Sequence, residues 1–158
     1  MDKTLILYYS LEGSTEKIAK YLAEELTLDI ERVRPKKEIK SKGFFKYVIG
    51  GYQATAKRKP KLNPLTHNLD DYSTIIIGSP VWAGGVSSPI YSLLKANIIK
   101  NKKIGMFYTC EGGNKKTDDL IKNLVSENNS LISICSLKAV SKDLENQKAK
   151  SLNWAKNF

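Results

Sequence analysis

The sequence predicts a doubly wound α/β domain with a five-stranded parallel sheet and helices on both faces. Short apolar segments of strand length alternate about five times with segments of helical periodicity. Most of the apolar segments are continuous, which is typical of parallel strands that are covered on both faces. We expect strands at Thr4 to Tyr9, Leu28 to Val33, Ser73 to Gly78, Lys103 to Thr109 and Leu131 to Val140.

The segments between these strands carry apolar residues at helical spacing. We expect helices at Ser14 to Leu26, about Phe44 to Ala56, Pro89 to Ala96, Thr117 to Asn128, and about Asp143 to Lys156. Right-handed crossovers then bring the loops after strands one, three and four to the carboxyl edge of the sheet. Open α/β sheets bind their ligands at this edge.

Length and composition indicate one soluble domain over residues 1–158. No run of about 18 apolar residues is present, and the N-terminal segment with Asp2 does not have the pattern of a signal peptide. We therefore expect a cytoplasmic protein without membrane insertion. Cys110 and Cys135 form no Cys-x-x-Cys pair and His67 is the only histidine, so no disulfide scaffold and no metal site is expected.

The net charge of +10 is concentrated in one segment. Between Arg34 and Lys61, ten Lys or Arg residues stand against one acid, Glu38, which leaves a charge of +9 there. Such a segment indicates either a surface that meets an acidic partner or an ordinary solvated excursion.

The loop Ser10-Leu11-Glu12-Gly13-Ser14-Thr15 lies between the first strand and the first helix. Backbone N–H groups at a helix N-terminus, together with three hydroxyls, form an anion site that suits a phosphate monoester. The loop matches neither Gly-x-x-x-x-Gly-Lys-Ser/Thr nor Gly-x-Gly-x-x-Gly, and it contains no Lys or Arg. The pattern Ser/Thr-x-x-Gly-x-Thr resembles the flavodoxin family, whose corresponding loop holds the phosphate of FMN. The resemblance implies that Ser10, Glu12, Gly13, Ser14 and Thr15 bind the cofactor.

The loop after the third strand, Ser79 to Pro89, contains a tryptophan in a segment rich in proline and glycine. By the resemblance, Trp82 packs against the isoalloxazine ring and the neighbouring backbone contacts the ring edge. The alternative is that Trp82 folds down over the end of the sheet, because tryptophan is usually well buried. The residues of this loop that we expect at the cofactor are Ser79, Pro80, Val81, Trp82, Ala83 and Gly84.

The loop after the fourth strand is also glycine-rich. The resemblance implies that Thr109, Cys110, Gly112 and Gly113 lie at the pyrimidine edge of the flavin. A nucleophilic role for Cys110 is the alternative, but no histidine lies near it in the sequence, so a small residue lining the site is the favoured interpretation.

Together the three loops are similar to the FMN loops of flavodoxin-family proteins, and their order and spacing extend over the whole chain. The segment from Gly43 to Leu62 looks like that of small bacterial flavodoxin-like proteins. The resemblance implies non-covalent FMN, the strand order 2-1-3-4-5 and the short-chain form of the fold.

The expected function is electron transfer through FMN, with an acidic redox partner protein or a small electron donor or acceptor. The alternative function is that of an FMN-dependent NAD(P)H/quinone-type oxidoreductase, and two features favour it. The chain is basic where flavodoxin carriers are acidic, and the third loop has no aromatic residue to cover the second flavin face. That face is either open to a nicotinamide or quinone, or covered by Tyr47 or Tyr52. A flavin-free module that binds polyanions through residues 34–61 is the further alternative. Nucleic acid is disfavoured as a partner because the segment contains no recognised nucleic-acid motif.

Overall fold

The computed structural model describes residues 2–38, 59–112, 115–125 and 128–158. Five strands form a parallel sheet in the order β2(Asp29–Arg32), β1(Thr4–Tyr8), β3(Thr74–Trp82), β5(Lys103–Cys110) and β6(Ser130–Lys138). A two-residue strand, β4(Gly85–Val86), pairs antiparallel with the end of β3. The predicted order 2-1-3-4-5 is confirmed, because β5 and β6 are the fourth and fifth parallel strands along the chain.

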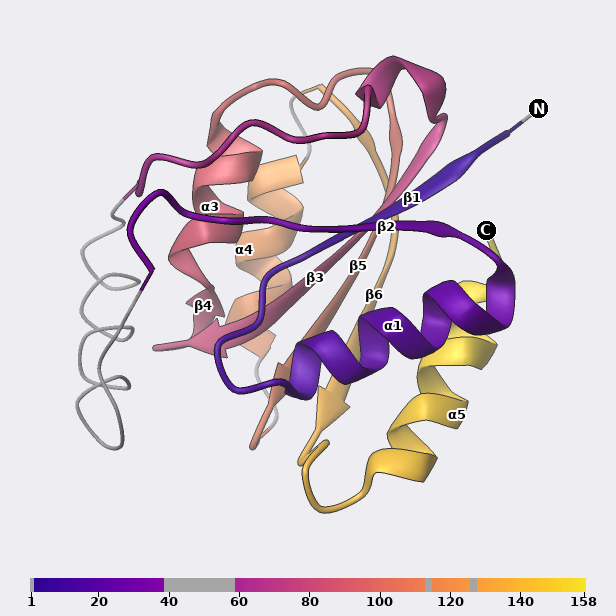
Figure 1. Ribbon diagram of the computed structural model, residues 1–158. Helices are drawn as coiled ribbons and strands as arrows, with labels where there is room; N and C mark the ends of the chain where they lie inside the picture. The colour runs from indigo at the N-terminus through magenta and orange to yellow at the C-terminus, as the bar shows by residue number, and fades with distance from the viewer. Residues whose placement is uncertain (1, 39–58, 113–114, 126–127) are drawn as a thin grey trace.

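The helices form a layer on each face of the sheet (Figure 1). Helices α1(Ser14–Leu26) and α5(Leu144–Ala155) cover one face, and α3(Ser88–Lys95) and α4(Lys115–Val125) cover the other. A single 3₁₀ turn, η1(Leu69–Asp71), precedes β3. These four helices confirm the predicted ones: α1 has the predicted ends, and the ends of the other three are shifted by one to three residues. The helix expected at Phe44 to Ala56 lies outside the described residues.

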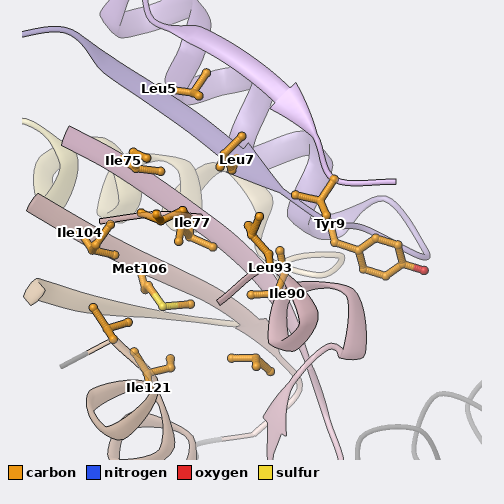
Figure 2. Close-up of a cluster of buried hydrophobic side chains, with 14 of the residues drawn as sticks. Leu5, Leu7, Tyr9, Ile75, Ile77, Ile90, Leu93, Ile104, Met106 and Ile121 are labelled. Atoms are coloured by element: carbon orange, nitrogen blue, oxygen red, sulfur yellow. The ribbon is translucent and has the colours of Figure 1, made fainter. Parts of the chain in front are cut away.

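Alternate side chains of each strand fill the two sides of the sheet, as the pleat requires. Leu7, Ile77 and Met106 lie beneath α3 and α4 and are fully buried (Figure 2). Ile6 and Phe107 point to the opposite side, toward α1 and α5. Burying an aliphatic or aromatic side chain contributes about 1.5–3 kcal/mol, so these two layers stabilise the sheet from both faces.

The third strand is longer than expected, and the expectation that it ends at Gly78 is wrong. It continues through Pro80, which pairs with Thr109, to Trp82, which pairs with Gly85 of β4. Ala83 and Gly84 have φ of 48° and 79° and form the two-residue turn between β3 and β4. Positive φ at both central residues is the type I′ arrangement that matches the twist of a hairpin. The Pro- and Gly-rich composition indicated a loop, whereas the chain forms a tight hairpin.

None of the helices within the described ranges is long and apolar enough to cross a lipid bilayer.

Candidate functional site

A cavity of about 320 Å³ lies at the carboxyl edge of the sheet. This volume is within the range of about 300–1,000 Å³ that is usual for small-molecule sites. The ends of β1, β3, β5 and β6 all contribute to its wall. The lining residues are Ser10, Leu11, Glu12, Ser14, Thr15, Pro80, Val81, Trp82, Ala83, Thr109, Cys110, Glu111 and Val140. The structure therefore brings the three predicted loops together in one place.

Most of the predicted site residues line this cavity, and a few do not. Those that do are Ser10, Glu12, Ser14, Thr15, Pro80, Val81, Trp82, Ala83, Thr109 and Cys110. Gly13, Ser79, Gly84 and Gly112 belong to the same loops but are not part of the wall. Gly113 lies outside the described residues, as do Tyr47 and Tyr52.

The first loop is shaped by hydrogen bonds from its own residues. The Gly13 N–H donates to Ser10 Oγ at 3.0 Å, and the Lys17 N–H donates to the Gly13 carbonyl at 2.9 Å to begin α1. Gly13 has φ of 103°, which favours glycine, and it has no side chain that could cap the helix. The first-turn N–H groups of α1 thus remain for an external acceptor, and the helix dipole favours an anion there.

Thr15 connects the first loop to the third. Its hydroxyl oxygen lies 2.8 Å from that of Thr109, and the hydrogen bond between them is buried. Thr15 is only 1% exposed, yet both residues contribute to the cavity wall. The bond therefore holds the start of α1 against the end of β5.

The Ser79 hydroxyl is used inside the protein. It lies within hydrogen-bond distance of the Pro80 carbonyl and the Ser87 hydroxyl, and it accepts a bond from the Ser87 N–H at 2.9 Å. Ser79 is completely buried. Its side chain joins the end of β3 to the start of α3, so it is not available to a molecule in the cavity.

Trp82 stands at the cavity wall and is held there by Tyr9. The two ring centroids are 5.6 Å apart with an interplanar angle of 89°, which is the edge-to-face geometry that aromatic pairs favour. Tyr9 is itself buried, and its hydroxyl, which points away from the core in Figure 2, donates to Glu38 Oε1 at 2.5 Å. Burial and the Glu38 carboxylate raise the pKa of Tyr9, so this donor stays protonated. Trp82 remains half-buried and lines the cavity.

The third loop contributes Cys110 and Glu111. The Cys110 thiol donates to the Gly112 carbonyl, and burial followed by the nearby Glu111 raises the pKa of the thiol. A raised pKa keeps the sulfur neutral and weakly nucleophilic, which agrees with the interpretation of Cys110 as a lining residue. Among the lining residues that the structure describes, the charged ones are Glu12 and Glu111, and none is a Lys or Arg.

Within the described ranges, no group of three or more His, Cys, Asp or Glu side chains is arranged to hold a metal ion. His67 is paired with Glu31 on the edge strand β2, with 2.7 Å between Nδ1 and Oε2.

Comparison with known proteins identifies the family. Residues 3–132 match the family of NADPH-dependent FMN reductases. The chain belongs to this family. Comparison with curated protein sequences gave no match.

Solved structures of flavoproteins and of a flavodoxin show the same architecture. The flavoprotein from Lactobacillus acidophilus NCFM, in complex with FMN, is 26% identical with a TM-score of 0.73, and the match covers 92% of this chain and 98% of that one. The apo form of the flavoprotein from the same organism is 24% identical with a TM-score of 0.69, and the match covers 90% of this chain and 96% of that one. Flavodoxin 1 from Bacillus cereus is 19% identical with a TM-score of 0.55, and 99% of each chain is covered.

These comparisons confirm the flavodoxin-like fold of this FMN reductase family member, and they support FMN as its cofactor. The roles of individual residues stay predictions.

Sequence reasoning missed three residues of the cavity wall, Leu11, Glu111 and Val140. Leu11 and Glu111 lie inside loops that the sequence singled out. Val140 follows β6, and its contribution could have been expected because the fifth parallel strand ends at the same edge of the sheet.

Proposed function

We propose that this chain transfers electrons through non-covalently bound FMN held in the cavity at the carboxyl edge of the sheet. The proposal rests on the convergence of three segments on one cavity. They are the hydroxyl-rich loop at the N-terminus of α1, the β3–β4 hairpin with Trp82, and the end of β5. FMN supplies the electron-transfer chemistry, and the protein binds it, orients it and sets its electrostatic surroundings.

The phosphate of FMN is assigned to the first loop. Ser14 lines the cavity, and the first-turn N–H groups of α1 and the hydroxyls of Ser10 and Thr15 are close by. Dipolar N–H groups and hydroxyls bind a phosphate by charge-assisted hydrogen bonds even where the loop itself contains no cation.

The ring of FMN is assigned to the space between the β3–β4 hairpin and the end of β5. Val81 and Trp82 from the hairpin, together with Cys110 and Val140, contribute apolar surface to the cavity wall. Tyr9 supports Trp82 from behind, so little side-chain freedom is lost when the ring binds.

The charge around the cavity supports a carrier. Glu12 and Glu111 are acids in the described wall, although the chain as a whole has a charge of +10. Nearby carboxylates disfavour added negative charge on a reduced flavin and so lower its potential. The local sign of charge at the site is therefore opposite to that of the whole chain.

The second candidate is two-electron reduction with NADPH, and the observation that favours it is membership of a family described as NADPH-dependent FMN reductases. The third loop offers no aromatic side chain to the cavity among its described residues, which favours a ring face that a nicotinamide or quinone can reach.

A group of exposed basic residues beside the bridge between Pro35 and Leu62 is the docking surface for an acidic redox partner. Pro35 bridges antiparallel to Leu62, the Lys36 N–H donates to the Lys61 carbonyl at 2.8 Å, and the Asn63 N–H donates to the Arg34 carbonyl at 2.8 Å. This pairing gathers five exposed cations that we name the basic ladder: Arg34, Lys36, Lys37, Lys59 and Lys61. Association with an acidic partner should slow as salt is raised, because exposed charges are screened beyond about 8–10 Å.

The first experiment tests FMN binding and its phosphate contact. Dissociation constants of FMN and riboflavin are measured for the wild type, Ser14→Ala and Ser130→Ala; Ser130 is exposed at the opposite edge of the sheet and serves as the matched control. We expect Ser14→Ala to weaken FMN about tenfold with little change in riboflavin, and Ser130→Ala to change neither. Equal loss of both flavins in Ser14→Ala would contradict the phosphate assignment, and no FMN uptake by the wild type would overturn the proposed function.

The second experiment separates the carrier from the reductase. An anaerobic reductive titration of the FMN-loaded protein is followed by its visible spectrum. A separate one-electron-reduced spectrum supports the carrier. Direct passage to the fully reduced flavin, with steady turnover of NADPH and a quinone, favours the reductase.

A further inference from the structure

Arg32 reaches from the neighbouring strand to the first loop. It is the last residue of β2 and pairs in register with Tyr8 of β1, so its side chain extends past the end of β1. Its Nη2 donates to the Ser10 carbonyl at 2.7 Å, and its Nη1 lies 3.5 Å from Glu16 Oε2. One guanidinium therefore contacts both the residue that begins the loop and the first turn of α1.

The contact with Ser10 controls where the polar atoms of the loop point. The Ser10 side chain already accepts the Gly13 N–H, so both polar groups of Ser10 shape the loop. The bond to the guanidinium fixes the Ser10 carbonyl oxygen and with it the backbone at the start of the loop. Arg32 is not part of the described cavity wall, so it acts through the loop and not on the ligand directly.

The contact with Glu16 compensates an acid close to the phosphate end of the site. Glu16 lies in the first turn of α1, where its charge would repel a bound phosphate. Its carboxylate is held by Lys20 at 2.8 Å, by Arg32 and by the Tyr8 hydroxyl at 3.3 Å. Arg32 and Lys20 thus offset the negative charge of Glu16, the one acidic side chain in this turn.

We propose that Arg32 is a positioning residue for the phosphate end of the FMN site, because its guanidinium joins the Ser10 carbonyl to Glu16 and so orders the loop between them. The proposal rests on the proposed function and deepens it. The sequence shows no cation between Ser10 and Glu16, and the structure supplies one from the adjacent strand. Arginine suits this role better than lysine, because its planar guanidinium presents N–H donors to two acceptors in a fixed geometry, whereas a lysine ammonium acts as a point charge.

Arg34 provides the matched control. It lies two residues further along the chain, its side chain is exposed, and it belongs to the basic ladder. Arg32→Gln and Arg34→Gln remove the same charge from the same end of β2. A long-range effect of charge would weaken FMN binding in both variants. Loss of loop positioning would weaken FMN binding only in Arg32→Gln.

The test measures dissociation constants of FMN and riboflavin for the wild type, Arg32→Gln, Arg32→Lys and Arg34→Gln, together with thermal unfolding of each apo form. We expect Arg32→Gln to weaken FMN about tenfold and riboflavin less than about twofold. Arg32→Lys should recover only part of the loss, and Arg34→Gln should keep FMN affinity within about twofold.

Equal effects of Arg32→Gln and Arg34→Gln would overturn the proposal, as would equal loss of FMN and riboflavin in Arg32→Gln. If Arg32→Gln does not fold, Arg32→Lys carries the same comparison, and full FMN affinity in that variant would show that charge alone is sufficient. A wild type that takes up no FMN would overturn the proposed function itself. A wild type that binds FMN, with Arg32 variants that bind it equally well, would overturn only the role of Arg32.

Discussion

The hydroxyl of Thr15 lies 2.8 Å from the hydroxyl of Thr109, although 94 residues separate them in the sequence. The bond crosses from the start of α1 to the end of β5 and is buried. Because a buried hydroxyl is costly without a partner, the two loops that approach the cavity are held together before any ligand enters. The site is therefore preorganised by a contact between two of its own walls.

A double-mutant cycle on this pair should show coupling. We expect Thr15→Val and Thr109→Val each to lower the free energy of unfolding of the apo protein by about 1–3 kcal/mol, because each leaves one buried hydroxyl unpaired. The double variant should cost less than the sum, since both polar groups are then gone. The check is urea unfolding of all four proteins, and strictly additive losses would show that the hydroxyls do not depend on each other.

Trp82 should report on bound flavin, and Trp154 should not. The chain contains two tryptophans, and only Trp82 lines the cavity, whereas the Trp154 Nε1–H donates to Ser133 on the α5 side of the sheet. We expect FMN to quench tryptophan emission strongly in Trp154→Phe and weakly in Trp82→Phe. The reverse order, measured at saturating FMN, would place the ring away from the β3–β4 hairpin.

The β3–β4 turn should become more stable with asparagine at its first position. Ala83 has φ of 48°, a conformation in which a non-glycine residue loses about 1–2 kcal/mol, and Asn-Gly is the favoured pair for a type I′ turn. We expect Ala83→Asn to stabilise the protein by about 0.5–1 kcal/mol and Ala83→Val to destabilise it. Ala96→Asn is the control, because Ala96 has φ of −69° and has no such strain to relieve. An increase in melting temperature that is the same at both sites would exclude the turn as its cause.

The Glu31 carboxylate should make stability depend on acid pH. Burial acts to raise its pKa, but hydrogen bonds from the backbone N–H groups of Thr66 and His67 and from the His67 ring outweigh burial and lower it. A lowered folded-state pKa means that this stabilisation is present above the unfolded pKa and is lost as the pH falls through the folded pKa.

Glu31→Gln should therefore be less stable than the wild type at pH 7, by about 1–3 kcal/mol, and the difference should shrink as the pH falls below about 4. Glu24→Gln, at an exposed position on α1, serves as the control. A difference between Glu31→Gln and wild type that stays constant from pH 7 to pH 3 would show that the charge of Glu31 is not involved.

Much of the fold could be predicted because its signals are local. Runs such as Ile75 to Ile77 are buried on both faces, and the alternation of such runs with helical segments determines a parallel sheet. The positions of the three loops follow from topology, which is why most of the expected site residues meet at one cavity.

The parts that sequence reasoning missed depend on contacts between distant segments. The sequence does not show that the Ser79 hydroxyl is used by Ser87, or that Arg32 binds the Ser10 carbonyl, because both depend on how two elements pack. The β3–β4 hairpin was missed for a different reason. Its turn contains Ala83-Gly84, whereas the pairs that predict a type I′ turn are Asn-Gly and Asp-Gly.

The bridge between Pro35 and Leu62 has a consequence for how the molecule tolerates change in length. The segment around Pro35 is hydrogen-bonded to the segment around Leu62, so these two parts of the chain are fixed beside each other. Closing a longer connection between fixed ends costs only about 0.6 kcal/mol for each doubling of its length. A change in the number of residues between the two paired segments should therefore cost the folded sheet little free energy.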